Sequence, residues 1–342
     1  ASPPNSFDAM TYHMSRVMHW SQNRSLRFYP TPILRQLHQC PWSEYAITHW
    51  QLLTGSDYLA NSVQWASYCG SVIAVSLITQ ELGGARLVQL VSGLVAATIP
   101  MGVLQASGAQ TDCVASLWCC SLVLFALRSR DDAAWDDTLF LGASTALGAL
   151  TKATIGLFAL PFIAWYALAI RKLPLRSSIT RVAAILALIA LVNAPQAARN
   201  CALYGGPLGP GHEGPEGSYK YNNDVISPAV LASNTLRNLA LHMATVPALD
   251  RPIEHAIGHL HAPLDLDPSD PRTTWTWTSF GMNGLSLHEG SAGYPLHLLL
   301  GIGAILASLC IKRLRRLPGL LLYSACCVLV LLAFCLLLHW QP

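Results

Sequence analysis

The chain has 342 residues, of which 52% are apolar and only 11% are charged, and its formal net charge is +3. An ordinary soluble domain carries about 25% charged residues, so this composition excludes a typical soluble protein, and the apolar excess excludes a disordered one. The small net charge excludes the strongly basic surface of a nucleic-acid-binding protein. We therefore expect an all-α polytopic membrane protein.

Eight apolar stretches separate the charged residues, and each is expected to form a membrane-spanning helix. A spanning helix needs about 20 apolar residues, with a range of about 17 to 25. The predicted helices cover 59–80, 87–103, 112–127, 138–151, 153–170, 180–195, 293–311 and 318–338. Because the chain begins inside a polar segment and stops after an apolar run, we expect an internal fragment whose upstream spanning helix is missing.

Basic residues concentrate in alternate connections between these helices, and this pattern predicts their orientation. They are Arg86, Arg128, Arg130, Arg171, Lys172, Arg176, Arg181, Lys312, Arg313, Arg315 and Arg316. Lys and Arg favour the cytoplasmic side of a membrane. Residues 1–57 are therefore expected to form a first extracytoplasmic loop and residues 196–292 a second, larger one. The spanning helices occupy 58–195 and 293–342.

Short helices lying on the membrane surface are expected within both outer segments. Residues 1–57 are rich in tryptophan and tyrosine, whose amphipathic rings suit the membrane interface. Ile253, Ile257 and Leu260 have helical spacing in the second segment. His255, His259 and His261 suggest a metal cluster, but Pro263 ends the helix and the His-Glu-x-x-His pattern is absent. We therefore predict no metal site there.

Four charged residues are expected at one depth, at the outer membrane boundary. Asp8 would follow the missing first helix, Asp112 begins the third visible helix, Lys152 lies in a tight outer turn, and Arg199-Asn200 follows the sixth helix. Charged groups near a membrane are costly and functional by default. Two cations could hold a lipid-linked phosphate, while a carboxylate takes a proton from an acceptor hydroxyl.

Each of these four residues also has a structural interpretation that stays open at this point. Asp112 could cap its helix, and Lys152 could extend to lipid headgroups. Arg199 could anchor a helix end at the interface, and Asp8 could be a solvated loop acid. Their shared depth is the stronger argument for function.

Five segments of the chain resemble the GT-C membrane glycosyltransferases, specifically glycosyltransferase family 39, with its protein O-mannosyltransferases and aminoarabinose transferases. They are Ser6 to His13, Pro41 to Tyr45, Gln110 to Asp112, Ala146 to Lys152, and Arg199 to Pro207. The order of these segments and their predicted side of the membrane carry the resemblance. It implies a bundle of transmembrane helices with an active site on the extracytoplasmic face, in a bacterial inner membrane.

The resemblance also implies roles for individual residues. Asp8 matches the family's catalytic aspartate and Asp112 its second acid, while Lys152 and Arg199 fall where phosphate contacts are expected. Further substrate contacts are expected at Asn200, His13, Glu44, Tyr204, His288 and Glu289. The protein O-mannosyltransferases carry a paired Asp-Glu in the first loop. This chain has Asp8-Ala9 instead, which argues against a protein acceptor.

The implied reaction moves a sugar from a polyprenyl-phosphate donor to an acceptor hydroxyl of a glycan, lipid or protein, with inversion. No cofactor is required, although Asp112 could orient a divalent cation. Two alternatives stay open: a polymerase or ligase of surface polysaccharide, and a polytopic transporter. Transporters usually place charges at mid-membrane, whereas the charges here are predicted at the outer ends of helices.

Overall fold

The computed structural model describes residues 4, 6–210, 221–282, 284, 286–287 and 293–341. Two compact units make up the chain, and each is described by itself. The first unit comprises Ala1–Ala97 and Gln105–Ser218, and the second comprises Thr98–Leu104 and Tyr219–Pro342. The described residues are helical and contain no strand, apart from two isolated β-bridges. The all-α prediction is therefore confirmed for this part of the chain.

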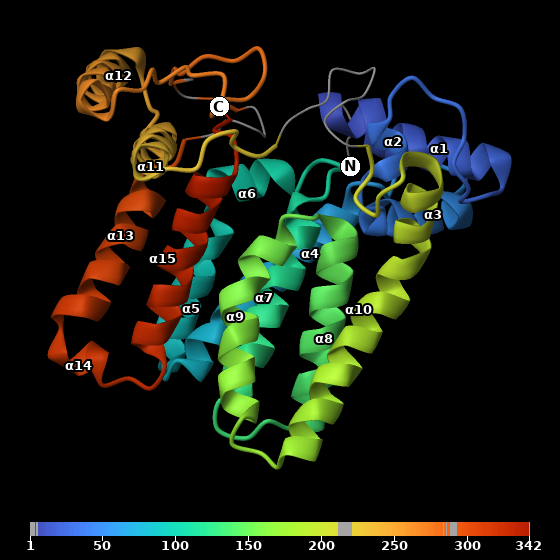
Figure 1. Ribbon diagram of the computed structural model, residues 1–342, viewed down its shortest axis with the longest axis horizontal. Coiled ribbons are helices and arrows are strands. Elements are labelled where there is room, and N and C mark those ends of the chain that lie inside the picture. The colour runs from blue at the N-terminus through green and yellow to red at the C-terminus, as the bar shows by residue number, and fades with distance from the viewer. Residues whose placement is uncertain are drawn as a thin grey trace. The chain divides into compact units, whose positions relative to one another are not determined.

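The first unit is a bundle of apolar helices with a cap of shorter ones (Figure 1). The bundle helices are α4 (Ser62–Glu81), α5 (Arg86–Ala97), α7 (Asp112–Arg128), α8 (Trp135–Thr151), α9 (Ile155–Ile170) and α10 (Leu175–Tyr204). Helix α7 packs against α4, α8 and α9, and α8 also packs against α10. Before the bundle come η1 (Ala9–His13), α1 (Met14–Asn23), α2 (Arg35–His38) and α3 (Trp42–Thr54).

The second unit contains two apolar helices and two amphipathic ones. Its elements are α6 (Pro100–Gln105), α11 (Pro228–His242), α12 (Pro247–His261), η2 (Ala262–Leu264), α13 (Pro295–Cys310), α14 (Lys312–Arg315) and α15 (Leu320–Leu337). Helix α11 packs against α12, α13 and α15. Ser227 caps α11 by accepting a hydrogen bond from the Val230 amide, and Pro228 follows it at the first helical position.

All eight predicted spanning helices have helical counterparts. Six differ from the predicted bounds by three residues or fewer at either end, and two differ more. The segment predicted as 87–103 divides into α5 and α6. Proline fits the first turn of a helix because it lacks a backbone N–H, and Pro100 begins α6. Helix α10 continues well beyond the predicted end at residue 195 and stops at Gly205, whose φ of 77° lies in the left-handed region.

Among the described residues, α10 and α15 are long and apolar enough to cross a membrane, while α5, α9 and α13 are apolar but shorter. Only 11% of the apolar window of α10 and 17% of that of α15 are buried within the structure. Such exposed apolar surface suits lipid, since soluble domains rarely expose it in large patches. The number of spans and their orientation stay predictions.

Candidate functional site

Asp8 lies directly before η1, a single turn of π-helix. Turns of this kind are rare and occur frequently at functional sites. The Asp8 side chain is 42% exposed, and its Oδ1 lies 3.9 Å from Nη1 of Arg35. The Arg35 guanidinium also lies 4.8 Å from the centre of the Tyr12 ring. Asp8 thus faces a cation beyond hydrogen-bonding distance, and solvent reaches its carboxylate.

Asp112 and Lys152 form an ion pair between two helix ends of the same bundle. Asp112 is the first residue of α7, and Lys152 follows the last residue of α8. Nζ of Lys152 lies 2.5 Å from Oδ1 of Asp112, and the two side chains are 43% and 40% exposed. The pair is therefore within reach of a ligand in solution.

The segments that carry the two aspartates lie side by side in the first unit. Nε2 of Gln110, two residues before Asp112, donates to Oγ of Ser6, two residues before Asp8, at 3.2 Å. Ala9 and Ala109 share one buried apolar cluster with Val17 and Ile47. The predicted convergence of the two acids is thus matched by contacts between their neighbouring residues.

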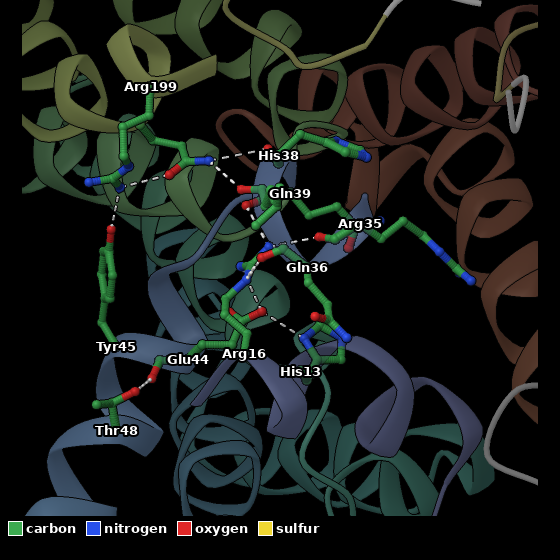
Figure 2. Close-up of polar contacts among 12 residues, drawn as sticks. His13, Arg16, Arg35, Gln36, His38, Gln39, Glu44, Tyr45, Thr48 and Arg199 are labelled. Carbon is green, nitrogen blue, oxygen red and sulfur yellow. Dashed lines mark hydrogen bonds and ion pairs between the residues drawn. The ribbon is translucent and has the colours of Figure 1, made fainter. Parts of the chain in front are cut away.

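The first unit also contains a buried ion network of His13, Arg16 and Glu44 (Figure 2). Glu44 on α3 accepts hydrogen bonds through Oε1 from Nδ1 of His13, at 2.8 Å, and from Nη1 of Arg16, at 3.0 Å. Burial raises the pKa of the Glu44 carboxyl, but Arg16 and His13 outweigh it and hold the pKa below its usual range. Glu44 is therefore a buried, charged anchor.

Arg16 holds α2 by its backbone. Its Nε donates to the carbonyl of Gln36 at 2.6 Å, and its Nη2 donates to the carbonyls of Arg35 and Gln39 at 2.8 and 3.2 Å. The planar guanidinium suits this forked arrangement because its donors point in fixed directions. Since Arg35 faces Asp8, Arg16 fixes the backbone from which that contact is made.

The side chain of Gln36 ties the same helix to its surroundings. Its Nε2 donates to the carbonyl of Thr11 at 2.8 Å, and its Oε1 accepts from the hydroxyls of Tyr29 and Thr31. Thr11 belongs to η1, the turn that follows Asp8. Gln36 and Arg16 therefore attach α2 to the segment that carries the first aspartate.

The end of α10 also attaches to α2, through two amide side chains. Nε2 of Gln196 donates to the carbonyl of Leu37, and Nδ2 of Asn200 donates to the carbonyls of His38 and Pro207. Oδ1 of Asn200 accepts from Gln196 as well. The buried Asn200 amide is thus occupied by contacts within the protein.

Arg199 lies within α10, and not after the helix as the sequence predicted. Its Nη2 donates to the hydroxyl of Tyr45 and to Oε1 of Gln196, each at 2.7 Å, and its guanidinium lies 5.8 Å from the Phe28 ring centre. Nε of Arg199 is buried and has no hydrogen-bond partner among the described residues. The partners of this cation are therefore neutral.

His38 and Cys40 lie at the C-terminal side of α2. Burial, with the nearby charges of Arg16 and Arg35, lowers the pKa of His38 to about 4, so its ring is neutral near pH 7. Burial raises the pKa of the Cys40 thiol to about 11, while a hydrogen bond from the backbone of Ala153, next to Lys152, opposes it. The α2 region thus contacts Gln196 and Asn200, which lie near Arg199, and Ala153, which follows Lys152.

The remaining expected substrate contacts have different positions. His13 and Glu44 are buried in the ion network. Tyr204 ends α10, and its ring centre lies 6.1 Å from that of His38 in an edge-on arrangement. His288 and Glu289 lie outside the described residues. No group of three or more possible metal ligands occurs among the residues described, and the His255 and His259 rings lie 4.4 Å apart on the exposed side of α12.

Sequence reasoning missed Arg16, Arg35, Gln36 and Gln196 as members of this region. Arg16 and Gln196 act mainly on backbone carbonyls, and such acceptors leave no mark in a sequence. Arg16 lies three residues after His13, which places both side chains toward one side of a helical segment. That spacing, together with Glu44, was the one signal available.

One comparison with known proteins found a similarity for part of this chain. No curated protein and no solved structure matched the chain. Residues 39–194 match the family model described as dolichyl-phosphate-mannose-protein mannosyltransferase, in agreement with the resemblance to GT-C membrane glycosyltransferases predicted from the sequence.

Proposed function

We propose that this chain transfers a sugar from a polyprenyl-phosphate donor to an acceptor hydroxyl at the outer face of a membrane, with inversion at the anomeric carbon. The family match indicates a glycosyltransferase, and the exposed apolar helices support a membrane protein. The matched segment contains Asp112 and Lys152, whereas Asp8 and Arg199 lie outside it. Their roles therefore depend on the geometry of the first unit.

The observation that carries the proposal is the juxtaposition of two exposed aspartates, each facing a cation. The Ser6–Gln110 hydrogen bond brings their segments together, Arg35 faces Asp8, and Lys152 pairs with Asp112. A pair of acids with differing partners suits a reaction that must accept a proton and also position a polar substrate. Ion pairs as exposed as Asp112–Lys152 contribute little to folding stability, so a structural role alone explains them poorly.

In the proposed reaction, Asp8 orients the acceptor hydroxyl and takes its proton. The hydroxyl oxygen forms a bond to the anomeric carbon from the face opposite the phosphate. The bond from that carbon to the phosphate oxygen breaks, and polyprenyl phosphate leaves with the bonding electron pair. Because negative charge grows on the phosphate during this step, preorganised cations lower the barrier.

Arg199 is the proposed cation for the leaving phosphate, because its partners are neutral and its Nε has no hydrogen-bond partner in the part of the chain that the structure describes. Arginine binds phosphate oxygens through its fork of donors. Lys152 is held by Asp112 in this structure. In the proposal, a donor phosphate draws Lys152 from that pair, and Asp112 becomes available to a sugar hydroxyl or a cation.

The directions of the helices support action at one membrane face. Helix α7 runs from Asp112 to Arg128, and α8 returns from Trp135 to Thr151, directly before Lys152. A helix of 17 residues spans about 25 Å at about 1.5 Å per residue. The Asp112–Lys152 pair is thus far from Arg128, which belongs to the set expected in the cytoplasm.

An open hollow of about 270 Å³ borders the segment that carries Asp8. Met10 of η1, Met14 and Met18 of α1, and Gln51 and Asp57 contribute to its lining. Methionine side chains adapt to irregular apolar ligands. This hollow is the proposed contact for an apolar part of the donor or of the acceptor.

The test is sugar transfer from radiolabelled polyprenyl-phosphate sugars in membranes containing the full-length protein. Asp8→Asn is expected to lower transfer by about 10²- to 10⁴-fold, the usual contribution of a general base, at an equal amount of folded protein. Asp131→Asn, a change at an exposed acid beyond the far end of α7, is the matched control and should retain activity. Transfer by Asp8→Asn at the wild-type rate would refute the catalytic role of Asp8.

A further inference from the structure

Trp277 in the second unit combines two unusual properties. Its side chain is 82% exposed, and its φ of +63° lies in the left-handed region. A bulky residue in this region is a genuine outlier, because its Cβ crowds the backbone. Strained residues persist only where the surroundings hold them, and they cluster at functional sites.

Hydrogen bonds on both sides of Trp277 hold its loop in place. The Trp275 amide donates to the carbonyl of Trp340, and the Trp340 amide donates to the carbonyl of Thr273, each at 2.9 Å. The Thr278 hydroxyl donates to the carbonyl of Trp275 at 2.7 Å, and the Phe280 amide donates to the Ser269 hydroxyl. The indole of Trp277 is therefore displayed on an anchored turn.

The anchor of this turn is itself buried deeply. Trp340 is almost fully buried, and the guanidinium of Arg237 lies 5.3 Å from the centre of its ring. Arg237 also donates to the hydroxyls of Thr273 and Thr274 and to the carbonyl of Pro268. Both ends of the loop are thus fixed by one polar cluster.

Further aromatic and hydroxyl groups lie within two residues of Trp277 along the chain or contact such a neighbour. The rings of Tyr221 and Trp275 are 5.1 Å apart, and Tyr221 is exposed. Thr276 and Ser279, which flank Trp277 in the sequence, are also exposed. Aromatic faces pack against the C–H face of a sugar ring by dispersion, while hydroxyls can bond to the ring's own hydroxyls.

We propose that Trp277, with Tyr221, Trp275 and the hydroxyls of Thr276 and Ser279, forms a binding site for a neutral saccharide chain. This inference rests on the proposed transferase function, and it names a glycan as the class of acceptor. A membrane surface is the competing occupant for an exposed tryptophan. The neighbouring Asp270–Arg272 ion pair, at 2.6 Å, and the hydroxyl-rich sequence favour the saccharide.

The test is titration of purified full-length protein with mannotriose, maltotriose and chitotriose, measured by saturation-transfer NMR and calorimetry. Trp277→Gly removes the indole, and glycine adopts the left-handed backbone without strain, so this variant should fold at least as well as the wild type. We expect at least one trisaccharide to bind, and Trp277→Gly to weaken its binding about tenfold or more. Trp277→Phe, which keeps an aromatic face, should lose about threefold or less.

A matched control is Tyr58→Ala, because Tyr58 is an exposed aromatic residue of the first unit, and it should bind as the wild type does. The proposal is overturned if none of the trisaccharides binds, or if Trp277→Gly binds them as the wild type does. The fluorescence of Trp277 is the difference between the emission of the wild type and that of Trp277→Gly. If brominated lipid in nanodiscs quenches this difference, Trp277 contacts the membrane and the proposal is overturned.

This binding assay also separates the inference from the proposed function. Asp8→Asn should abolish sugar transfer without changing trisaccharide affinity. Trp277→Gly should lower transfer to the glycan, yet leave slow transfer of the sugar from the donor to water unchanged. Unchanged transfer in Asp8→Asn would refute only the catalytic proposal, and unchanged binding in Trp277→Gly would refute only the saccharide site.

Discussion

The first unit holds two acid–cation pairs that differ in their exposure to solvent. Glu44 is fully buried with Arg16 and His13, whereas Asp112 and Lys152 are each about two-fifths exposed. A buried charge must keep its partner, because an unpaired one is costly in a medium of low polarity. An exposed pair can exchange a partner for a ligand at little cost. The comparison favours a structural role for the buried pair, and the proposed function uses the exposed one.

The largest effect is expected from removing the buried cation. Arg16→Met leaves Glu44 without its strongest partner and removes the contacts to three carbonyls of the α2 region. Breaking a buried pair in this way costs about 3–5 kcal/mol. Thermal unfolding of the protein in detergent should show a midpoint many degrees lower. Arg27→Met, a change at an exposed arginine, is the control. Equal unfolding midpoints for the two variants would contradict the structural role of the buried pair.

A smaller loss of folding stability is expected at Gly209, which packs closely against His38 of α2. Gly209 has a φ of +105°, and a Cβ there would lie 2.6 Å from Cβ of His38. Gly209→Ala should therefore cost about 1–3 kcal/mol from overpacking, beyond the backbone cost of about 1 kcal/mol. Gly55→Ala shares a positive φ of +69° but has open space around the added carbon. Chemical denaturation should separate the two variants, and equal losses would contradict the close contact at His38.

The pH dependence of stability distinguishes His38 from Glu44. The folded protein lowers the pKa of His38 from 6.5 to about 4, so the unfolded chain binds a proton that the folded protein excludes. Stability should fall as the pH drops from about 6.5 to 4, by at most about 1.4 kcal/mol per pH unit. The lowered pKa of Glu44 adds its loss only below about pH 4.5.

His38→Gln should flatten this dependence between pH 6.5 and 5, and unfolding curves collected at half-unit steps would detect the change. His49→Gln replaces an exposed histidine on α3 and should leave the slope as it is in the wild type. A slope that persists in His38→Gln would assign the acid sensitivity to another group.

The smallest effect on stability is expected at the exposed pair. Asp112→Asn removes the charge that holds Lys152, but a pair of this exposure contributes about 0–1 kcal/mol. Its unfolding midpoint should stay close to that of the wild type, while sugar transfer declines. A stability loss as large as that of Arg16→Met would show that Asp112 is a structural residue, and the functional contrast between the two pairs would fail.

The sequence alone predicted the helices of the bundle well, because long apolar stretches between sparse charges have few alternatives. It also predicted that Asp112 and Lys152 would lie at helix ends, since charged residues end such stretches. It misplaced Arg199, because nothing in the polar residues after position 195 marks the point where α10 stops. Gly205 provides that end in the structure through its left-handed backbone.

Only the tertiary structure decided which acids are buried. Asp8, Glu44 and Asp112 are all isolated carboxylates in the sequence, and hydropathy does not distinguish them. The path of α2 presents its carbonyls to Arg16, which is enclosed with Glu44, whereas the side chains of Asp8 and Asp112 stay about two-fifths exposed. That path is held mainly by side-chain bonds to backbone carbonyls, which every residue possesses. The sequence therefore determined the helices and the charges available at their ends, whereas the fold determined which charges a substrate can reach.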